Sequence, residues 1–117
     1  MDVVGLTRQL IDIESVTGNE GQVGDCLYAE LSRLGYRASK MPVERERSNV
    51  FAVSPREPHP TIVFSTHMDT VPPFIPSSED RTRVYGRGAC DAKGIIAAQI
   101  AAAELLRREG IDVGLLF

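Results

Sequence analysis

The sequence has few cysteines, no long apolar run and no cluster of basic residues. Cys26 and Cys90 fall in different predicted elements, and two lone thiols are typical of a reducing compartment rather than a disulfide framework. Gln99 and Glu104 interrupt the most apolar segment, residues 94–106, so no run has the length that a membrane-spanning helix requires. We therefore expect a cytoplasmic protein without membrane contact.

The charge pattern excludes two further classes. The net charge is −3, and the arginines and lysines are scattered among acidic residues, so no nucleic-acid-binding surface is expected. Asp2, Arg8 and Asp12 lie where a signal peptide needs an uninterrupted apolar core. The hydrophobic fraction of 43% over 117 residues is enough for one globular unit with a modest core.

Two helices are predicted in the first third of the chain. Apolar residues recur at helical spacing over residues 3–13 and again over residues 23–34. Asp2 is the expected N-cap of the first helix. Asn19, followed three residues later by Gln22, resembles a capping box for the second.

The remainder alternates strand-like runs with one apolar helix. A proline-containing stretch, residues 72–80, is expected to be an irregular loop. The predicted segments are strands at residues 38–43, 49–53, 61–66, 83–85 and 113–117, and a buried crossover helix at residues 94–108. This order predicts an α/β fold with a mixed sheet sandwiched by helices.

A histidine and a carboxylate follow the third strand-like run in the segment FSTHMDTVP. Ligands gather at the carboxyl ends of strands in open α/β sheets, where His67 and Asp69 are expected. An imidazole binds metal well when a carboxylate holds its other ring nitrogen. We therefore predict that His67 binds a metal and that Asp69 orients it; the alternative is an accidental, solvated loop triplet.

A second loop, YGRGACDAKG, supplies another carboxylate, Asp91. Gly86 and Gly88 allow tight backbone geometry, so the turn can bring Asp91 close to an ion. A glycine-rich turn before a helix can instead bind phosphate. However, Asp91 occupies the position where a dinucleotide fingerprint needs its third glycine, and a carboxylate there attracts a cation rather than phosphate.

Together, STHMDTVP, YGRGACDAKG and the alanine-rich helix after them resemble the two amino-terminal metal motifs of the M20 family of zinc-dependent peptidases and amidohydrolases. That family includes acetylornithine deacetylase, succinyl-diaminopimelate desuccinylase, aminoacylase and carboxypeptidase G2. The resemblance covers essentially the whole chain. It implies an α/β zinc-peptidase catalytic domain, of which residues 1–117 are the amino-terminal portion.

The resemblance also implies specific roles. His67 is expected to bind one zinc, Asp91 to bridge two zincs, and Asp69 to orient His67; cobalt or manganese can also suit such ligands. The implied reaction is hydrolysis of an amide bond in a small N-acyl amino acid or peptide, by a deacylase or exopeptidase. The loop from Pro72 to Arg83 lacks the tryptophan found in several members.

Other parts of the family pattern fall outside the sequence. They are a Glu-Glu pair after the last strand, further ligands and a lid or dimerisation domain. Alone, the chain is therefore expected to be inactive, and to expose apolar surface that promotes a homodimer or association with a complementing chain. The alternative is a non-catalytic binding or interaction module, or half of a split enzyme.

Two further reactive side chains are expected to be bystanders. His59 lies between two prolines in a polar loop, without the defined scaffold that a metal ligand needs. Cys90 has no histidine base nearby in the sequence, so we interpret it as a small packing residue rather than a nucleophile.

Overall fold

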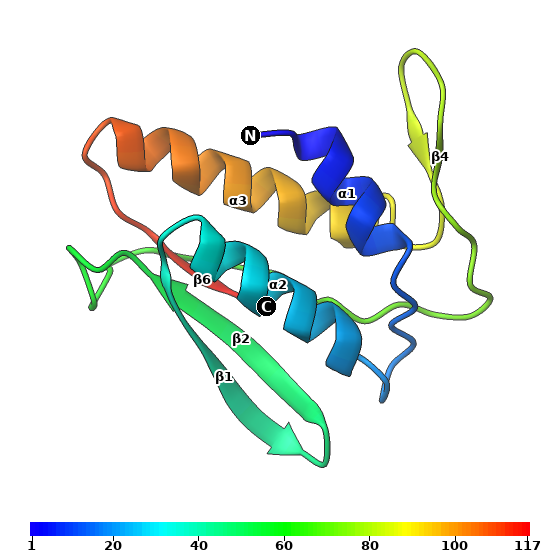
Figure 1. Ribbon diagram of the computed structural model, residues 1–117, viewed down its shortest axis with the longest axis horizontal. Coiled ribbons are helices and arrows are strands. Elements are labelled where there is room, and N and C mark those ends of the chain that lie inside the picture. The colour runs from blue at the N-terminus through cyan, green and yellow to red at the C-terminus, as the bar shows by residue number, and fades with distance from the viewer.

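The computed structural model describes residues 1–117 and contains three helices and six strands (Figure 1). The helices are α1 (Val3–Ile11), α2 (Gly21–Arg33) and α3 (Lys93–Arg108). The strands are β1 (Arg37–Glu44), β2 (Arg47–Val53), β3 (Val63–Ser65), β4 (Ser78–Glu79), β5 (Val84–Tyr85) and β6 (Gly114–Leu116). None of the helices is long and apolar enough to span a bilayer.

Four strands form a mixed sheet in the order β1-β2-β6-β3. β1 pairs with β2, and β2 with β6, in antiparallel fashion, whereas β3 and β6 are parallel. A parallel pair needs a crossover connection, and α3 provides it. The connection from β3 to α3, residues 66–92, contains both sequence motifs and therefore brings them to one end of the sheet.

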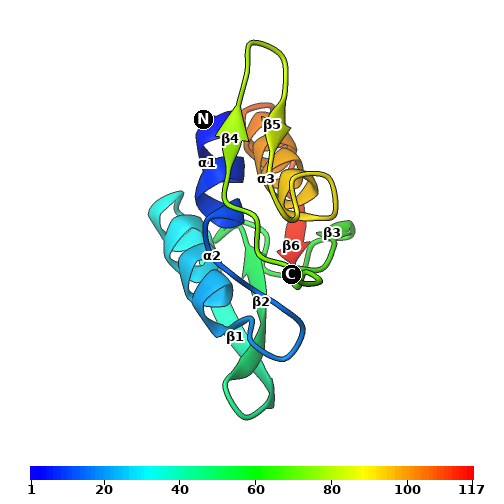
Figure 2. The ribbon, with the colours of Figure 1, turned by 90° about the vertical axis from the view of Figure 1, so that its right-hand side faces the viewer.

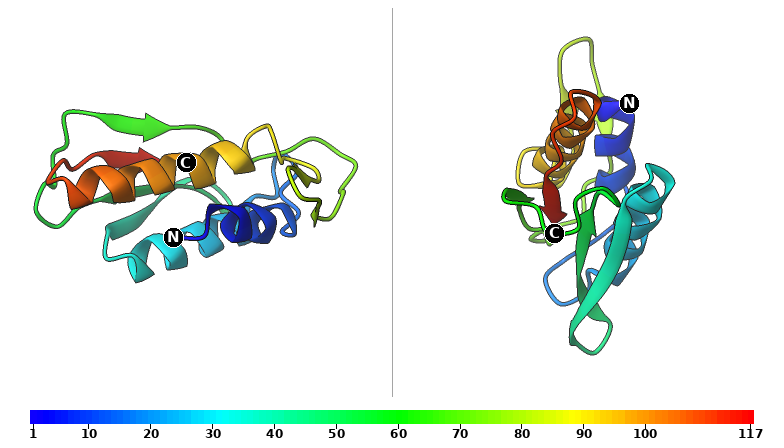
Figure 3. Two further views of the ribbon diagram at one scale, coloured as in Figure 1. Left: turned by 90° about the horizontal axis from the view of Figure 1, so that it is seen from above. Right: turned by 90° about the vertical axis from the view of Figure 1, so that its left-hand side faces the viewer.

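All three helices lie on one side of this sheet (Figures 2 and 3), where α2 packs on β1 and β2, α3 packs on β6, and α1 packs against α3. Val50 and Ala52 on β2 and Leu115 on β6 point to that face, and they form one core with Leu27 of α2 and Ile100 of α3. All five side chains are completely shielded from solvent. The α/β class and the mixed sheet are thus confirmed.

The other face of the sheet is not covered by a helix of this chain. Phe51 and Leu116 are partners in the β2–β6 register, and they lie between the inward-facing core positions. On the same face, Met41 and Val63 are 47% and 42% exposed. Within residues 1–117 the helices therefore form a single layer on the sheet.

A short hairpin replaces part of the loop that the prolines predict to be irregular. β4 and β5 pair in antiparallel fashion (Figure 2), so the prediction of no regular structure up to Asp80 was wrong. The Asp80 carboxylate accepts hydrogen bonds from the backbone N–H groups of Thr82 and Arg83 and from the Tyr85 hydroxyl. These bonds lower the pKa of Asp80 to about 2 and hold the turn closed.

The predicted N-cap is correct for α1 and wrong for α2. Asp2 caps α1 as predicted, accepting a hydrogen bond from the Gly5 N–H at 2.8 Å. The predicted capping box at Asn19 is wrong, because the N-cap of α2 is Glu20 and its side chain makes no cap bond. The Glu20 carboxylate instead accepts hydrogen bonds from the Gly18 N–H and from the Nε and Nη2 groups of Arg47.

The ion pair between the buried Glu20 and the partly exposed Arg47 should make the stability of the fold depend on pH. Burial raises the pKa of Glu20, but the Gly18 and Arg47 hydrogen bonds outweigh it, so the pKa lies below its ordinary value of 4.5. A carboxyl with a lowered folded-state pKa stabilises the fold above its unfolded pKa, and that stability is lost as the pH falls through the folded pKa. At pH 7, Glu20→Gln should cost about 1–3 kcal/mol of unfolding free energy.

Urea unfolding of wild type and Glu20→Gln between pH 7 and pH 3 measures this effect. The difference between the two proteins should shrink as the pH falls, because wild-type Glu20 then takes up a proton. Glu46→Gln is the matched control, because the exposed Glu46 side chain lies next to Arg47, in the turn between β1 and β2. A Glu20→Gln penalty that stays constant down to pH 3 would contradict the linkage.

Candidate metal centre

His67 and Asp69 are placed by the buried residue between them. The chain continues past β3 in extended form, and Met68 turns into the core, where only 6% of it is exposed. Successive side chains of an extended segment point to opposite sides, so His67 and Asp69 both project outward on the same side. The alternation His-Met-Asp thus fixes the direction of the predicted metal-binding pair.

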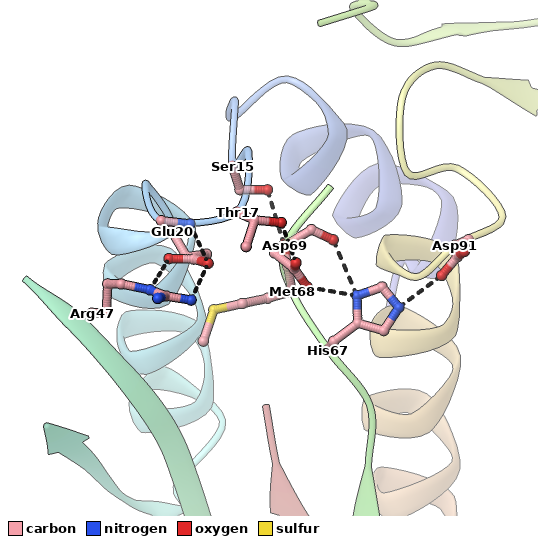
Figure 4. A network of polar contacts seen from close by, with 9 residues as sticks. Ser15, Thr17, Glu20, Arg47, His67, Met68, Asp69 and Asp91 are labelled. Carbon is pink, nitrogen blue, oxygen red and sulfur yellow. Dashed lines mark hydrogen bonds and ion pairs between the residues drawn. The ribbon is translucent and has the colours of Figure 1, made fainter. Parts of the chain in front are cut away.

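The segment between α1 and α2 holds this extended chain in place. Val16 forms a parallel bridge with Thr70. The Thr70 N–H donates to the Ser15 carbonyl at 2.8 Å, and the Thr17 N–H donates to the Thr70 carbonyl at 3.2 Å. The buried Ser15 hydroxyl donates to the Met68 carbonyl at 2.9 Å (Figure 4). Residues 68–70 are therefore braced by a segment that the sequence motifs do not include.

The loop that carries Asp91 is held by a buried lysine. Gly88 has φ +90° and lies so close to the Lys93 and Thr70 side chains that a Cβ there would be 3.0 Å from each. Lys93 is 1% exposed, its ammonium donates to the Ile13 carbonyl, and burial lowers its pKa to about 8. The peptide bond between Asp91 and Ala92 is cis. No local pattern in the sequence indicates that Lys93 holds this loop.

The two motifs meet at His67 (Figure 4). Its Nδ1 lies 2.9 Å from Asp69 Oδ1 and 3.1 Å from the Asp69 carbonyl oxygen, and its Nε2 lies 2.7 Å from Asp91 Oδ1. The side chains of His67, Asp69 and Asp91 are 52%, 34% and 81% exposed. The fold therefore brings together all three residues that the sequence singles out, in a place that solvent reaches.

The two carboxylates change the acid–base properties of His67. Burial lowers the pKa of His67, but the hydrogen bonds to Asp91 and Asp69 outweigh it and leave the pKa above its ordinary value. The pKa of Asp69 lies below its ordinary value, chiefly because the Thr17 hydroxyl donates to it. Each nitrogen of the imidazole thus faces a carboxylate.

These residues fit part of a zinc site. Zinc prefers imidazole nitrogen and carboxylate oxygen among its ligands. Here one of each converges, and a second carboxylate holds the other imidazole nitrogen, as is usual for a zinc-binding histidine. No group of three or more His, Cys, Asp or Glu side chains in the structure could by itself hold a metal ion. His67 and Asp91 would therefore be two ligands of such a site, and a complete coordination sphere would need others.

The remaining predicted residues lie around this centre or away from it. His59 is exposed in its loop, where its N–H donates to Glu57. Cys90 is exposed rather than packed, and it lines a hollow of about 250 Å³ together with His67 and Asp91. Arg87 lines the same hollow, and its Nε donates to the Pro73 carbonyl at 3.0 Å.

Residues 63–117, which include both motifs, match the model of the family described as peptidase family M20/M25/M40. A protein of Emericella nidulans named as a probable carboxypeptidase is 42% identical over 97% of this chain, which corresponds to 30% of that protein. A protein of Schizosaccharomyces pombe named as containing a peptidase M20 domain is 38% identical over 99% of this chain and 31% of its own length. The chain thus spans about a third of the curated relatives that it matches.

Solved structures give the same fold. An M20 family metallo-carboxypeptidase from Sulfolobus solfataricus has a TM-score of 0.82 at 19% identity, over 99% of this chain and 30% of that one. An aminopeptidase from Bacillus cereus has a TM-score of 0.79 at 21% identity, over 97% of this chain and 35% of that one. These structures confirm the fold, and the family match of residues 63–117 together with the curated relatives confirms the resemblance to the M20 family that the two motifs indicate.

Proposed function

From this likeness to the M20 peptidases, we propose that the protein carrying this chain is a metal-dependent hydrolase of amide bonds in small peptides or N-acyl amino acids, of the exopeptidase or deacylase type. The observation that carries the proposal is His67, whose two ring nitrogens each meet a carboxylate from a different motif. The relatives named as probable carboxypeptidases support a peptide substrate with a free carboxylate.

His67 and Asp91 are the proposed metal ligands, and zinc is the metal that their donor types fit best. The family resemblance implies two zincs in the complete site, and Asp91 would be the ligand common to both. When bound, zinc lowers the pKa of a coordinated water and polarises an amide carbonyl, the two effects that amide hydrolysis requires.

The residues of this chain prepare that chemistry. Asp69 accepts a hydrogen bond from the Nδ1–H group of His67, so Nε2 is the ring nitrogen that would bind a metal. Nε2 lies 2.7 Å from Asp91 Oδ1, and it would have to lose its proton before a metal binds there. Asp91, whose side chain is 81% exposed, would supply the second ligand. The adjoining hollow lined by Cys90 and Arg87 leaves open space beside the ligands.

We also propose that residues 1–117 by themselves do not turn over substrate. The chain has no group of three potential ligands, and two ligands alone would bind a metal weakly. The carboxylates that line the hollow are Asp69 and Asp91, so neither is left to act as a general base. General base catalysis typically contributes about 100- to 10,000-fold to rate. The alternative function is a non-catalytic module, which requires neither zinc binding nor hydrolysis in the full protein.

A hydrolysis assay separates these two functions. The full-length protein should cleave short peptides or N-acetyl amino acids, lose activity on treatment with a chelator, and regain it with zinc. Phosphate should not raise its thermal stability, because Asp91 repels anions. If the zinc-loaded, full-length protein cleaves no amide in a panel of peptides and N-acyl amino acids, the non-catalytic function is favoured.

Asp69→Asn tests the orienting role in that protein. The near-isosteric amide keeps the shape but removes the negative charge that stabilises the His67 Nδ1 proton. Metal affinity or turnover should therefore fall by about 10- to 100-fold with some metal retained. Calorimetric zinc titration and steady-state kinetics measure the two effects. Wild-type values of both would mean that Asp69 does not orient His67.

A further inference from the structure

The carboxylate of Asp69 is divided between two partners. Its Oδ1 lies 2.9 Å from His67 Nδ1, and its Oδ2 accepts a hydrogen bond from the Thr17 hydroxyl at 2.6 Å (Figure 4). Bonding to His67 alone leaves the carboxylate free to swing about its side-chain bonds. A second bond on the opposite oxygen fixes both its position and its plane.

The backbone delivers Thr17 to this place independently of its hydroxyl. Thr17 follows Val16, which bridges to Thr70, and hydrogen bonds on both sides of that bridge join residues 15–17 to residue 70. Thr17 is itself exposed, so its side chain contributes little to the core. A valine here keeps the shape and the backbone bonds and removes only the hydroxyl.

We propose that Thr17 is a positioning residue, which holds Asp69 so that Asp69 in turn holds His67 in its metal-binding orientation. The inference rests on the proposed function for the role of His67 as a ligand, but the contact between Thr17 and Asp69 does not depend on it. The chain Thr17–Asp69–His67–Asp91 thereby connects the segment before α2 to the loop before α3.

The first measurement uses the full-length protein without metal. Three-bond NMR couplings from Asp69 Cγ to its backbone nitrogen and carbonyl carbon report the χ1 rotamer. Wild type and Thr17→Ser, which keeps the hydroxyl, should show one Asp69 rotamer, and Thr17→Val should show averaging. Thr61→Val is the control, because Thr61 is an exposed threonine in another loop. A single unchanged rotamer in Thr17→Val would overturn the inference.

Thr17→Val must keep the backbone hydrogen bonds that join residues 15–17 to Thr70. The Thr70 and Thr17 amide protons should keep their wild-type protection from hydrogen exchange in Thr17→Val. If rotamer averaging appears only together with loss of that protection, Thr17 has a structural role in the bridge, and the positioning role is wrong.

The second measurement is zinc affinity of the full-length protein at fixed pH. Thr17→Val should weaken binding by about 3- to 10-fold, less than the effect of a group in direct contact with a ligand, and Thr17→Ser should restore it. In an Asp69→Asn background, Thr17→Val should cause no further loss, because the effect passes through Asp69. An equal loss in both backgrounds would contradict the inference.

The two arms also separate this inference from the proposed function. If the wild-type protein binds no zinc while Thr17→Val still frees Asp69, the metal site fails and the positioning of Asp69 stands. If zinc binding is normal and neither the Asp69 rotamer nor the affinity responds to Thr17→Val, the metal site stands and the role of Thr17 is wrong.

Discussion

Replacing His67 by alanine, or Asp91 by asparagine, is expected to remove the bound metal from the full-length protein and abolish amide hydrolysis together. Each change deletes a proposed ligand, and the residues described here supply only these two to the site. The loss should therefore be nearly complete, well beyond the 10- to 100-fold effect expected of Asp69→Asn. Elemental analysis of the purified variants and a peptide-hydrolysis assay measure both consequences.

Because both side chains are exposed, the substitutions should change metal binding without changing the stability of the fold. The side chains of His67 and Asp91 are 52% and 81% exposed, so neither substitution leaves a cavity. Without metal, the free energy of unfolding of each variant should therefore lie within about 0.5 kcal/mol of the wild-type value. His59→Ala, which changes the other histidine of the chain, should retain full metal content and activity. Metal at wild-type stoichiometry in His67→Ala would exclude His67 as a ligand.

Gly94→Ala is expected to destabilise the fold and displace the Asp91 loop. A Cβ on Gly94 would lie 2.3 Å from the carbonyl oxygen of Ala89, far inside contact distance. The obstacle is backbone, so it cannot rotate away as a side chain could. Relief requires the turn between Ala89 and α3 to open, and Asp91 lies in that turn. The cost in unfolding free energy should be about 3 kcal/mol, the upper range for overpacking.

Gly21→Ala is the matched control for this substitution. Gly21 also opens a helix, but a Cβ there would meet its nearest neighbour, the Glu46 carbonyl oxygen, at 3.4 Å. Since alanine is a better helix former than glycine, Gly21→Ala should leave stability unchanged or slightly raised. Urea unfolding and zinc titration of both variants complete the test. If Gly94→Ala is as stable as Gly21→Ala, the turn accommodates a Cβ at residue 94, and the predicted clash is wrong.

The sequence predicts the fold and the main site residues well because both depend on local patterns. Helical spacing of apolar residues identifies α1 and α2, a run of mostly apolar, helix-forming residues identifies α3, and the apolar strand before His67 identifies the end of the sheet where ligands gather. The prediction that His67, Asp69 and Asp91 form one site rests on that strand end, on the glycine-rich turn and on the resemblance to the M20 motifs, and the structure brings their side chains into contact.

The residues that the sequence did not predict act through contacts distant in the chain. Thr17 reaches Asp69 across 52 positions, and Lys93 reaches the Ile13 carbonyl across 80, so no local pattern identifies either. Competition for one side chain explains another difference. Glu20, at the N-cap position of α2, binds the Gly18 N–H and Arg47 instead of capping its helix.

The central claim is that His67 and Asp91 hold a metal while Asp69 orients the imidazole. A crystal structure of the zinc-loaded, full-length protein, with anomalous data collected at the zinc edge, tests it most directly. Zinc should lie about 2.0–2.1 Å from His67 Nε2 and about 2.0–2.2 Å from an Asp91 oxygen, with Nδ1 still bonded to Asp69. Zinc bound elsewhere, or bound to His67 through Nδ1, would contradict the account.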